Sequence, residues 1–365
     1  MIALKQLGSF KNGLNFGAEA ITETGYDIIG IPDFGDNYVA PNHNLKKVNS
    51  EIVLSDYLLA EDDILFVRSN GNKALVGRTM IVKDIENPTT FSGFCIRYRP
   101  DSKKVFPLYM LYLFKSPIFR RFFANNQQTS ITNLNQDVLG SILIDLPSLE
   151  KQKAIANTIH CITRQIENNN LINDNLQQVI KSCFDFMFAT RKSNGIISDI
   201  LQEHPKSTIQ VNDSTGILGD YPFFTSGEAI NEWQSALVDG MNCYLSTGGN
   251  ATIKGYYGKA AYSTDTWCVC GKGEYSFYLF CYLKSIIRSI NDSFFAGSGL
   301  KHLQKDSLLL VNLYIPSEKE LEKFNSIVKP AMETMTKLFL ETKKLKQQRD
   351  FLLPLLMNGQ ATIAE

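Results

Sequence analysis

The 365-residue chain lacks several features that would have narrowed its class. It has no excess of charge, because 37 lysines and arginines balance 37 aspartates and glutamates, which excludes a uniformly basic nucleic-acid coat but allows a local basic surface. No run of about 18 uncharged apolar residues is present, so we expect no membrane span. Residues 1–7 have no charged start followed by an apolar run, so we expect no secretory signal. The seven cysteines are odd in number and lack framework spacing, which favours reduced thiols in a cytoplasmic protein.

Patterns that carry catalysis or bind metals are also scarce. No Gly-x-x-x-x-Gly-Lys-Ser/Thr run exists, which excludes a P-loop. The glycine pair at residues 248–249 lacks the Gly-x-Gly-x-x-Gly spacing of a dinucleotide-binding turn. Cys268 and Cys270 have no second cysteine pair or histidine cluster to complete a zinc site, and the four histidines are scattered. We therefore expect no bound metal, no catalytic residue and no covalent chemistry by this chain alone.

The sequence does contain an internal repeat. Since 44% of the residues are hydrophobic, the chain can fill the cores of two or three domains. Identical residues recur at a constant offset of 169 positions, which favours two halves with a common frame. An old duplication without remaining functional meaning is the alternative. The matched pairs include Tyr109 and Tyr278, Leu134 and Leu303, Asp137 and Asp306, and Pro147 and Pro316.

Each half divides into a globular part and a helical part. Residues 1–147 and 196–316 alternate short β-branched runs with Gly, Asn and Asp, which predicts strands, and contain helical stretches between them. Residues 148–195 and 317–365 hold few glycines and prolines, and each predicts one long helix. The expected fold is α+β, with two mixed α/β domains separated by two long antiparallel helices and a pseudo-two-fold internal repeat.

Both helical segments show the alternating spacing of three and four residues that is typical of a coiled coil. The seams run from Ile155 to Met187 and from Leu321 to Leu356, and at about 1.5 Å per residue each helix would reach roughly 60 Å. We expect the two helices to pack on each other, with Asn169 and Asn173 setting their register at a cost in stability. The alternative is that these asparagines lie on an exposed face.

Prolines and a glycine add expectations for the second helix. Pro330 lies inside it and predicts a kink or a break between a short and a long helix. Pro354 lies near its expected end, with Gly359 beyond it as terminator.

Several stretches spread along the chain carry a family resemblance when taken together. They are DILFVRS at 63–69, TNL at 132–134, IDLPSLEKQ at 144–152, YSTDTW at 262–267, GSG at 297–299 and LLPLLMNGQ at 352–360.

With these stretches the chain resembles the specificity subunit of a type I restriction–modification enzyme over nearly its whole length, although the second junction, at 315–321, lacks the glutamine of the first. The resemblance implies that residues 1–147 and 196–316 are target-recognition domains, each of which reads one half of a bipartite site in double-stranded DNA. It implies that the helices set the gap and dock two modification (methyltransferase) subunits, and that restriction (endonuclease) subunits join them. S-adenosylmethionine, ATP and magnesium would then belong to those partners, with no cofactor on this chain.

Base edges specify sequence, whereas phosphate contacts position the protein, so polar side chains on Gly- and Asn-rich loops are the candidate readers. Ordinary solvated turn chemistry is the alternative for each loop. Residues 1–147 hold 15 basic and 15 acidic residues, and residues 196–316 hold 8 and 11, so we expect weak DNA binding by the isolated chain. The candidates are Arg68, Ser69, Asn70, Asn72, Lys73, Arg78, Gln127, Gln128, Thr129 and Ser130 in the first domain, and Ser246, Thr247, Asn250, Thr252, Lys254, Tyr256, Tyr257, Lys259, Lys301 and His302 in the second.

Two rival functions stay open from the sequence. One is the DNA-recognition subunit of a two-chain, type IIB-like restriction enzyme that cleaves on both sides of its site. The other is a coiled-coil scaffold that joins two protein-binding domains and has no role with DNA.

Overall fold

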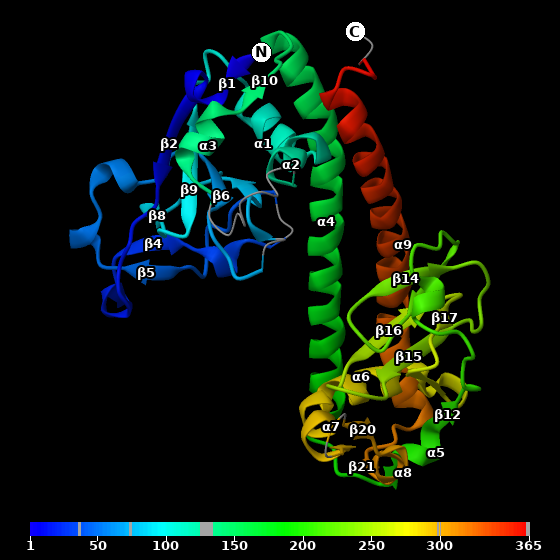
Figure 1. Ribbon diagram of the computed structural model, residues 1–365. Coiled ribbons are helices and arrows are strands. Elements are labelled where there is room, and N and C mark those ends of the chain that lie inside the picture. The colour runs from blue at the N-terminus through cyan, green and yellow to red at the C-terminus, as the bar shows by residue number, and fades with distance from the viewer. Residues whose placement is uncertain (36–37, 73–74, 125–133, 298, 300, 363–365) are drawn as a thin grey trace. The chain divides into compact units, whose positions relative to one another are not determined.

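The computed structural model describes residues 1–35, 38–72, 75–124, 134–297, 299 and 301–362 (Figure 1). The chain forms two compact units, one made of Met1–Gln165 with Leu345–Glu365 and the other of Ile166–Lys344. Two helices of 40 residues each, α4 (Leu149–Phe188) and α9 (Glu318–Met357), contribute a part to each unit.

The described residues of the first unit form two four-stranded sheets and a strand pair. The order of the main sheet is β2-β9-β6-β7, all antiparallel, and that of the second sheet is β3-β5-β4-β8, in which β4 and β8 are parallel. β1 pairs with β10. The bounds are β1 (Ile2–Ala3), β2 (Gly8–Asn12), β3 (Ile21–Thr22), β4 (Tyr26–Ile29), β5 (Lys46–Val48), β6 (Ile64–Val67), β7 (Thr79–Ile81), β8 (Thr89–Phe91), β9 (Cys95–Pro100), β10 (Leu143–Ile144), α1 (Pro107–Lys115), α2 (Pro117–Ala124) and α3 (Gln136–Ser141).

The described part of the second unit repeats the main sheet and has a smaller second sheet. Its main sheet has the order β12-β18-β15-β16, its second sheet has the order β14-β13-β17 with β13 and β17 parallel, and β11 pairs with β21 and β19 with β20. The bounds are β11 (Gly195–Ile196), α5 (Ile197–Ile200), β12 (Leu201–Glu203), β13 (Tyr221–Phe224), β14 (Ile230–Trp233), β15 (Met241–Ser246), β16 (Ile253–Tyr257), β17 (Ala261–Tyr262), β18 (Thr266–Gly271), α6 (Ser276–Ser285), α7 (Ile287–Ser293), β19 (Phe295–Ala296), β20 (His302–Leu303), α8 (Lys305–Leu309) and β21 (Asn312–Leu313).

The 169-residue offset predicted from the sequence holds for whole helices. α1, α3 and α4 begin 169 residues before α6, α8 and α9, respectively. In each unit a short apolar helix, α1 or α6, packs on the main sheet, and its side chains are buried on nearly every face. The predicted α+β class with a repeated domain is confirmed.

The two long helices pack antiparallel in both units. In the second unit Phe184 near the end of α4 shares a core with Phe324 near the start of α9. In the first unit the opposite ends meet, because Ile159 of α4 shares a core with Leu353 and Leu356 of α9. Every predicted seam position on either helix is buried or half-buried, which confirms the predicted seams.

The polar seam positions are also enclosed. Asn169 is only 8% exposed and Asn173 is half-buried, so the alternative of an exposed asparagine face is wrong. Among the described residues, Asn169 Nδ2, Asn173 Oδ1 and Thr342 Oγ1 are buried without a hydrogen-bond partner. The role of the asparagines in setting register stays a prediction.

The prolines of α9 behave differently from each other. Of the kink or break predicted at Pro330, the break is wrong, because α9 continues through it, and the kink stays a prediction. Pro330 and Ser326, whose carbonyl loses its helical donor there, are both exposed, so solvent can satisfy that carbonyl. The predicted end is confirmed, since Gly359 has a φ of 72° and Gln360 N donates to Leu355 O at 2.9 Å, the pattern of a glycine-terminated helix.

Candidate nucleic-acid interface

Two equivalent loops carry nine of the 20 candidate DNA-binding residues. Residues 68–78 join β6 to β7, and residues 247–252 join β15 to β16. Arg68 N donates to Phe94 O at 2.8 Å, and Arg68 O accepts from Leu134 N at 2.8 Å. Thr247 repeats this pattern, because its N donates to Asp265 O at 3.2 Å and its O accepts from Leu303 N at 3.0 Å. Arg68 and Thr247 therefore occupy the same place in the two domains with different side chains.

The second loop is held from within by one hydroxyl. Ser246 Oγ donates to Asn250 O at 2.7 Å and accepts from Thr252 N at 2.9 Å. Gly249 lies between them with a φ of 79°, a left-handed conformation that glycine adopts without strain. These bonds fix the loop backbone and leave the Asn250 residue exposed.

A distant segment joins this loop. Gly249 N donates to Lys301 O at 3.0 Å, and Gly248 pairs with His302. Lys301 and His302 are both exposed. The structure thus brings together Thr247, Asn250 and the candidate pair at 301–302, although about 50 residues separate them in sequence.

The first loop lies next to arginines. Arg68 Nη1 donates to Gly93 O at 3.2 Å, and Asn70 Oδ1 accepts from Asn72 N at 2.8 Å. Burial, and secondly the positive charge of Arg78, lowers the pKa of Arg120 on α2. Arg120 was not among the predicted residues, and the arginine pair at 120–121 in an otherwise apolar helix is the signal that could have found it. The predicted residues Lys73, Gln127, Gln128, Thr129 and Ser130 lie outside the described residues.

Four further candidates of the second domain lie in β16 or just after it. Lys254 Nζ donates to Thr225 O at 3.0 Å and to Gly227 O, and burial lowers its pKa. The Tyr256 ring packs 6.0 Å from that of Phe339, and the Tyr257 ring packs 5.5 Å from that of Phe277. Core packing accounts for both tyrosines. Lys259 is exposed but follows the far end of β16.

The strands below the loops rest on different buried polar groups. In the first unit Asp63 is fully buried and accepts from Arg99 Nε at 2.7 Å and Nη2 at 2.6 Å. In the second unit Asn242 stands five positions before Thr247, as Asp63 stands before Arg68, and its Oδ1 lies 2.7 Å from His204 Nε2. The two domains therefore support equivalent loops with different side-chain pairs.

The described residues show neither a metal-binding cluster nor a helix suited to a membrane. Within the part of the chain that the structure describes, no three His, Cys, Asp or Glu side chains are grouped so as to hold a metal ion. No helix among the described residues combines the length and apolar character that a membrane crossing requires.

Comparison with known proteins defines the class. Residues 1–178 match the family described as Type I restriction modification DNA specificity domain. The resemblance to specificity subunits is thereby confirmed.

Particular relatives agree with this class. The type I restriction enzyme StySPI specificity subunit of Salmonella potsdam is 23% identical over 158 residues, which cover 43% of this chain and 34% of that protein. The EcoDI specificity subunit of Escherichia coli is 27% identical over 151 residues, which cover 40% and 33%. The matched part thus spans about a third of the length of these relatives. The crystal structure of the S subunit of a type I restriction–modification system from M. genitalium has the same fold, with a TM-score of 0.63, 14% identity and coverage of 97% of this chain and 94% of that one.

Proposed function

We propose that this chain is the sequence-specific DNA-binding specificity subunit of a type I restriction–modification complex, and that each domain reads one half of a bipartite site. The observation that carries the proposal is the repeated frame with different loops. Arg68 and Thr247 share their backbone hydrogen bonds, but one loop presents arginines and the other presents hydroxyl and amide groups. Two domains that share a fold but carry different polar loop side chains are suited to bind two different half-sites.

The charges near the two loops indicate which contacts to DNA this chain makes and which its partner subunits make. The first loop carries Arg68 and Arg78, whereas the second loop has Lys301 beside it in a domain that is net acidic. Most affinity for DNA comes from phosphate neutralisation. We therefore expect modification subunits to supply much of the phosphate contact, with S-adenosylmethionine, ATP and magnesium bound on the partner subunits in the cytoplasm.

The exposed face of α4 supports the docking of modification subunits. Ile172, Val179 and Phe186 stand seven residues apart and are 43%, 51% and 91% exposed. Apolar residues at this spacing form one stripe along a helix, which favours packing against a partner helix. The 40-residue helices, about 60 Å long, would set the gap between half-sites.

Methylome sequencing of cells that carry this chain with its modification subunit tests the proposal. We expect a gapped, two-part motif with methylated adenine. Arg78→Ala should relax one half of the motif and Asn250→Ala the other, whereas Lys259→Ala, at the far end of β16, should change neither. A motif without a gap, or methylation that is independent of this chain, would refute the proposal. A bipartite motif in a system whose partner fuses methyltransferase and nuclease would favour the two-chain alternative.

A further inference from the structure

Three residues on one face of α9 contact the second domain. Thr336, Phe339 and Lys343 are separated by three and four positions and so face the same way. Thr336 Oγ1 donates to Tyr257 O at 2.8 Å, and the Phe339 ring packs edge-on against Tyr256. Both of these contacts hold β16, in the main sheet.

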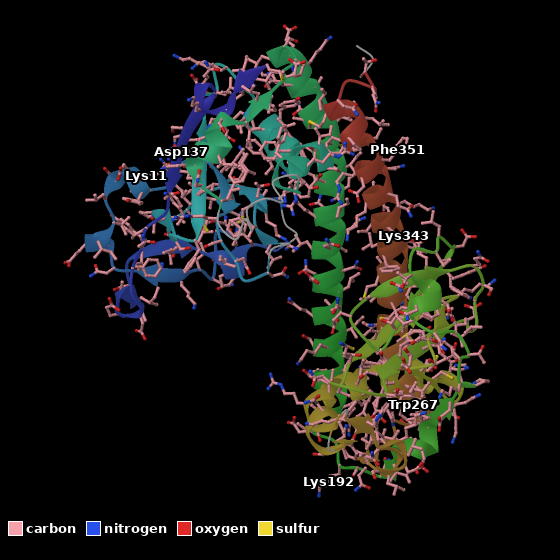
Figure 2. The ribbon with its side chains drawn as sticks, in the orientation of Figure 1. Lys11, Asp137, Lys192, Trp267, Lys343 and Phe351 are labelled. Carbon is pink, nitrogen blue, oxygen red and sulfur yellow. The ribbon has the colours of Figure 1, made fainter. Side chains whose placement is uncertain are left out.

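Lys343 holds the second sheet of the same domain. Its Nζ lies 3.0 Å from Glu232 Oε1 and donates to Gly219 O at 3.0 Å. Gly219 N donates to Glu232 Oε2 at 2.9 Å, which closes a ring of three polar contacts. The Lys343 and Glu232 side chains are only 26% and 21% exposed, so solvent screens this pair less than an open surface pair. Figure 2 shows Lys343 on α9.

Gly219 fits this ring because of its size. A Cβ at this position would overlap the Trp233 carbonyl, so the segment before β13 lies tightly against the end of β14. Lys343 and Glu232 therefore contact a tightly packed backbone, and the polar contacts of Thr336 and Lys343 lie about 10 Å apart along α9.

We propose that Lys343, Glu232 and Gly219 form a clamp that fixes the height and rotation of the second domain on α9 and so restricts the gap between half-sites that the protein accepts. This proposal rests on the proposed DNA-reading function. The core of the second unit already packs on α9 at Phe324, Val328 and Met332, and the Lys343 contact extends this attachment to the second sheet. The residues 169 positions before Thr336, Phe339 and Lys343 are Glu167, Asn170 and Asp174, so the lysine is particular to α9. None of the three clamp residues belongs to the candidate loops, and they are positioning residues.

The test uses the full chain with its modification subunit and the variants Lys343→Met and Glu232→Gln. Lys337→Met is the matched control, because Lys337 is an exposed lysine on the same helix. Methylome sequencing should show that both clamp variants keep both half-sites but methylate sites with gaps one base pair shorter or longer. We expect methylation at those sites to rise about tenfold over wild type, the factor that matches the loss of one charge-assisted hydrogen bond. The control should keep the wild-type gap only.

Hydrogen–deuterium exchange gives a second readout that does not depend on DNA. The Gly219 amide should exchange faster in Glu232→Gln than in wild type, and unchanged exchange would overturn the clamp. Weaker methylation at an unchanged gap would overturn its role in gap selection, because that is what a merely stabilising contact produces. If Lys343→Met fails to fold, Glu232→Gln carries the same tests. A wild-type chain that yields no bipartite motif would refute the proposed function, and the exchange result would still decide whether the clamp exists.

Discussion

Replacing Asp63 with asparagine tests the buried support of the first loop. Asp63 has no exposed surface, and it accepts two hydrogen bonds from Arg99 and one from Ala60 N at 2.8 Å. Asparagine keeps the size but turns one acceptor into a donor that faces other donors. Breaking a buried ion pair costs about 3–5 kcal/mol. Since Arg99 is 39% exposed and keeps a hydrogen bond to Leu58 O, we expect about 3 kcal/mol, the low end.

Asp62→Asn is the control for this substitution. Asp62 is 38% exposed and pairs with Lys83 at 2.6 Å, a surface contact worth less than about 1 kcal/mol. Its φ of 71° also suits asparagine. Urea unfolding would be followed by circular dichroism, which reports both units, and by tryptophan fluorescence, which reports only the second, since Trp233 and Trp267 both lie there. Asp63→Asn should shift the first signal and spare the second. A loss no larger than that of Asp62→Asn would refute the reasoning.

Three further predictions concern the helices. Asn169→Leu should raise the free energy of unfolding by about 1–2 kcal/mol in urea titrations, because no described residue pairs with its buried Nδ2; lower stability would contradict this. Burial, and then the charges of Arg164 and Lys83, hold the pKa of His160 below 6.5, so the folded state binds fewer protons there. The contribution of neutral His160 to the free energy of unfolding should be fully present above pH 6.5 and should fall as the pH drops below 6.5. His160→Gln should flatten that fall in urea midpoints measured at several pH values. Inserting residues at Asn173 should alter the methylated gap and spare both half-sites, and an unchanged gap would remove the spacer role.

Features that repeat in the sequence were predictable element by element. Identical residues at one offset leave no room for insertions between them, so α1 and α6, and the two long helices, had to fall in register. The seams were predictable because alternating spacings of three and four place apolar side chains on one helix face. The Gly359 terminator followed from its chemistry alone.

Contacts between distant segments were not predictable in the same way. Tyr256 and Tyr257 lie in a glycine-rich stretch that suggested a loop, and only the packing of β16 on α9 and α6 buries them. The pairing of Lys301 with Gly249 depends on a strand bridge that no local pattern announces. At Pro330 the expected break did not occur, and the proline lies on the exposed side of a helix that continues through it.

The buried pairs below the two loops predict how the domains can be exchanged. Grafting residues 242–257 in place of residues 63–81 would set the Asn242 amide against Arg99, which needs the carboxylate of Asp63, and would separate that asparagine from His204. We therefore expect the graft to unfold at a lower temperature than the parent chain, by the same mechanism as Asp63→Asn.

Exchange of the whole of residues 1–147 for the equivalent domain of another specificity subunit carries each buried pair with its partner. That chimera should fold, and methylome sequencing should show one new half-site and one unchanged half-site. A strand graft as thermally stable as the whole-domain chimera would show that the loops do not depend on the polar pairs beneath them. If the strand graft is the less stable of the two, the unit of exchange is the whole domain, because each loop is matched to the buried polar pair that supports its strands within that domain.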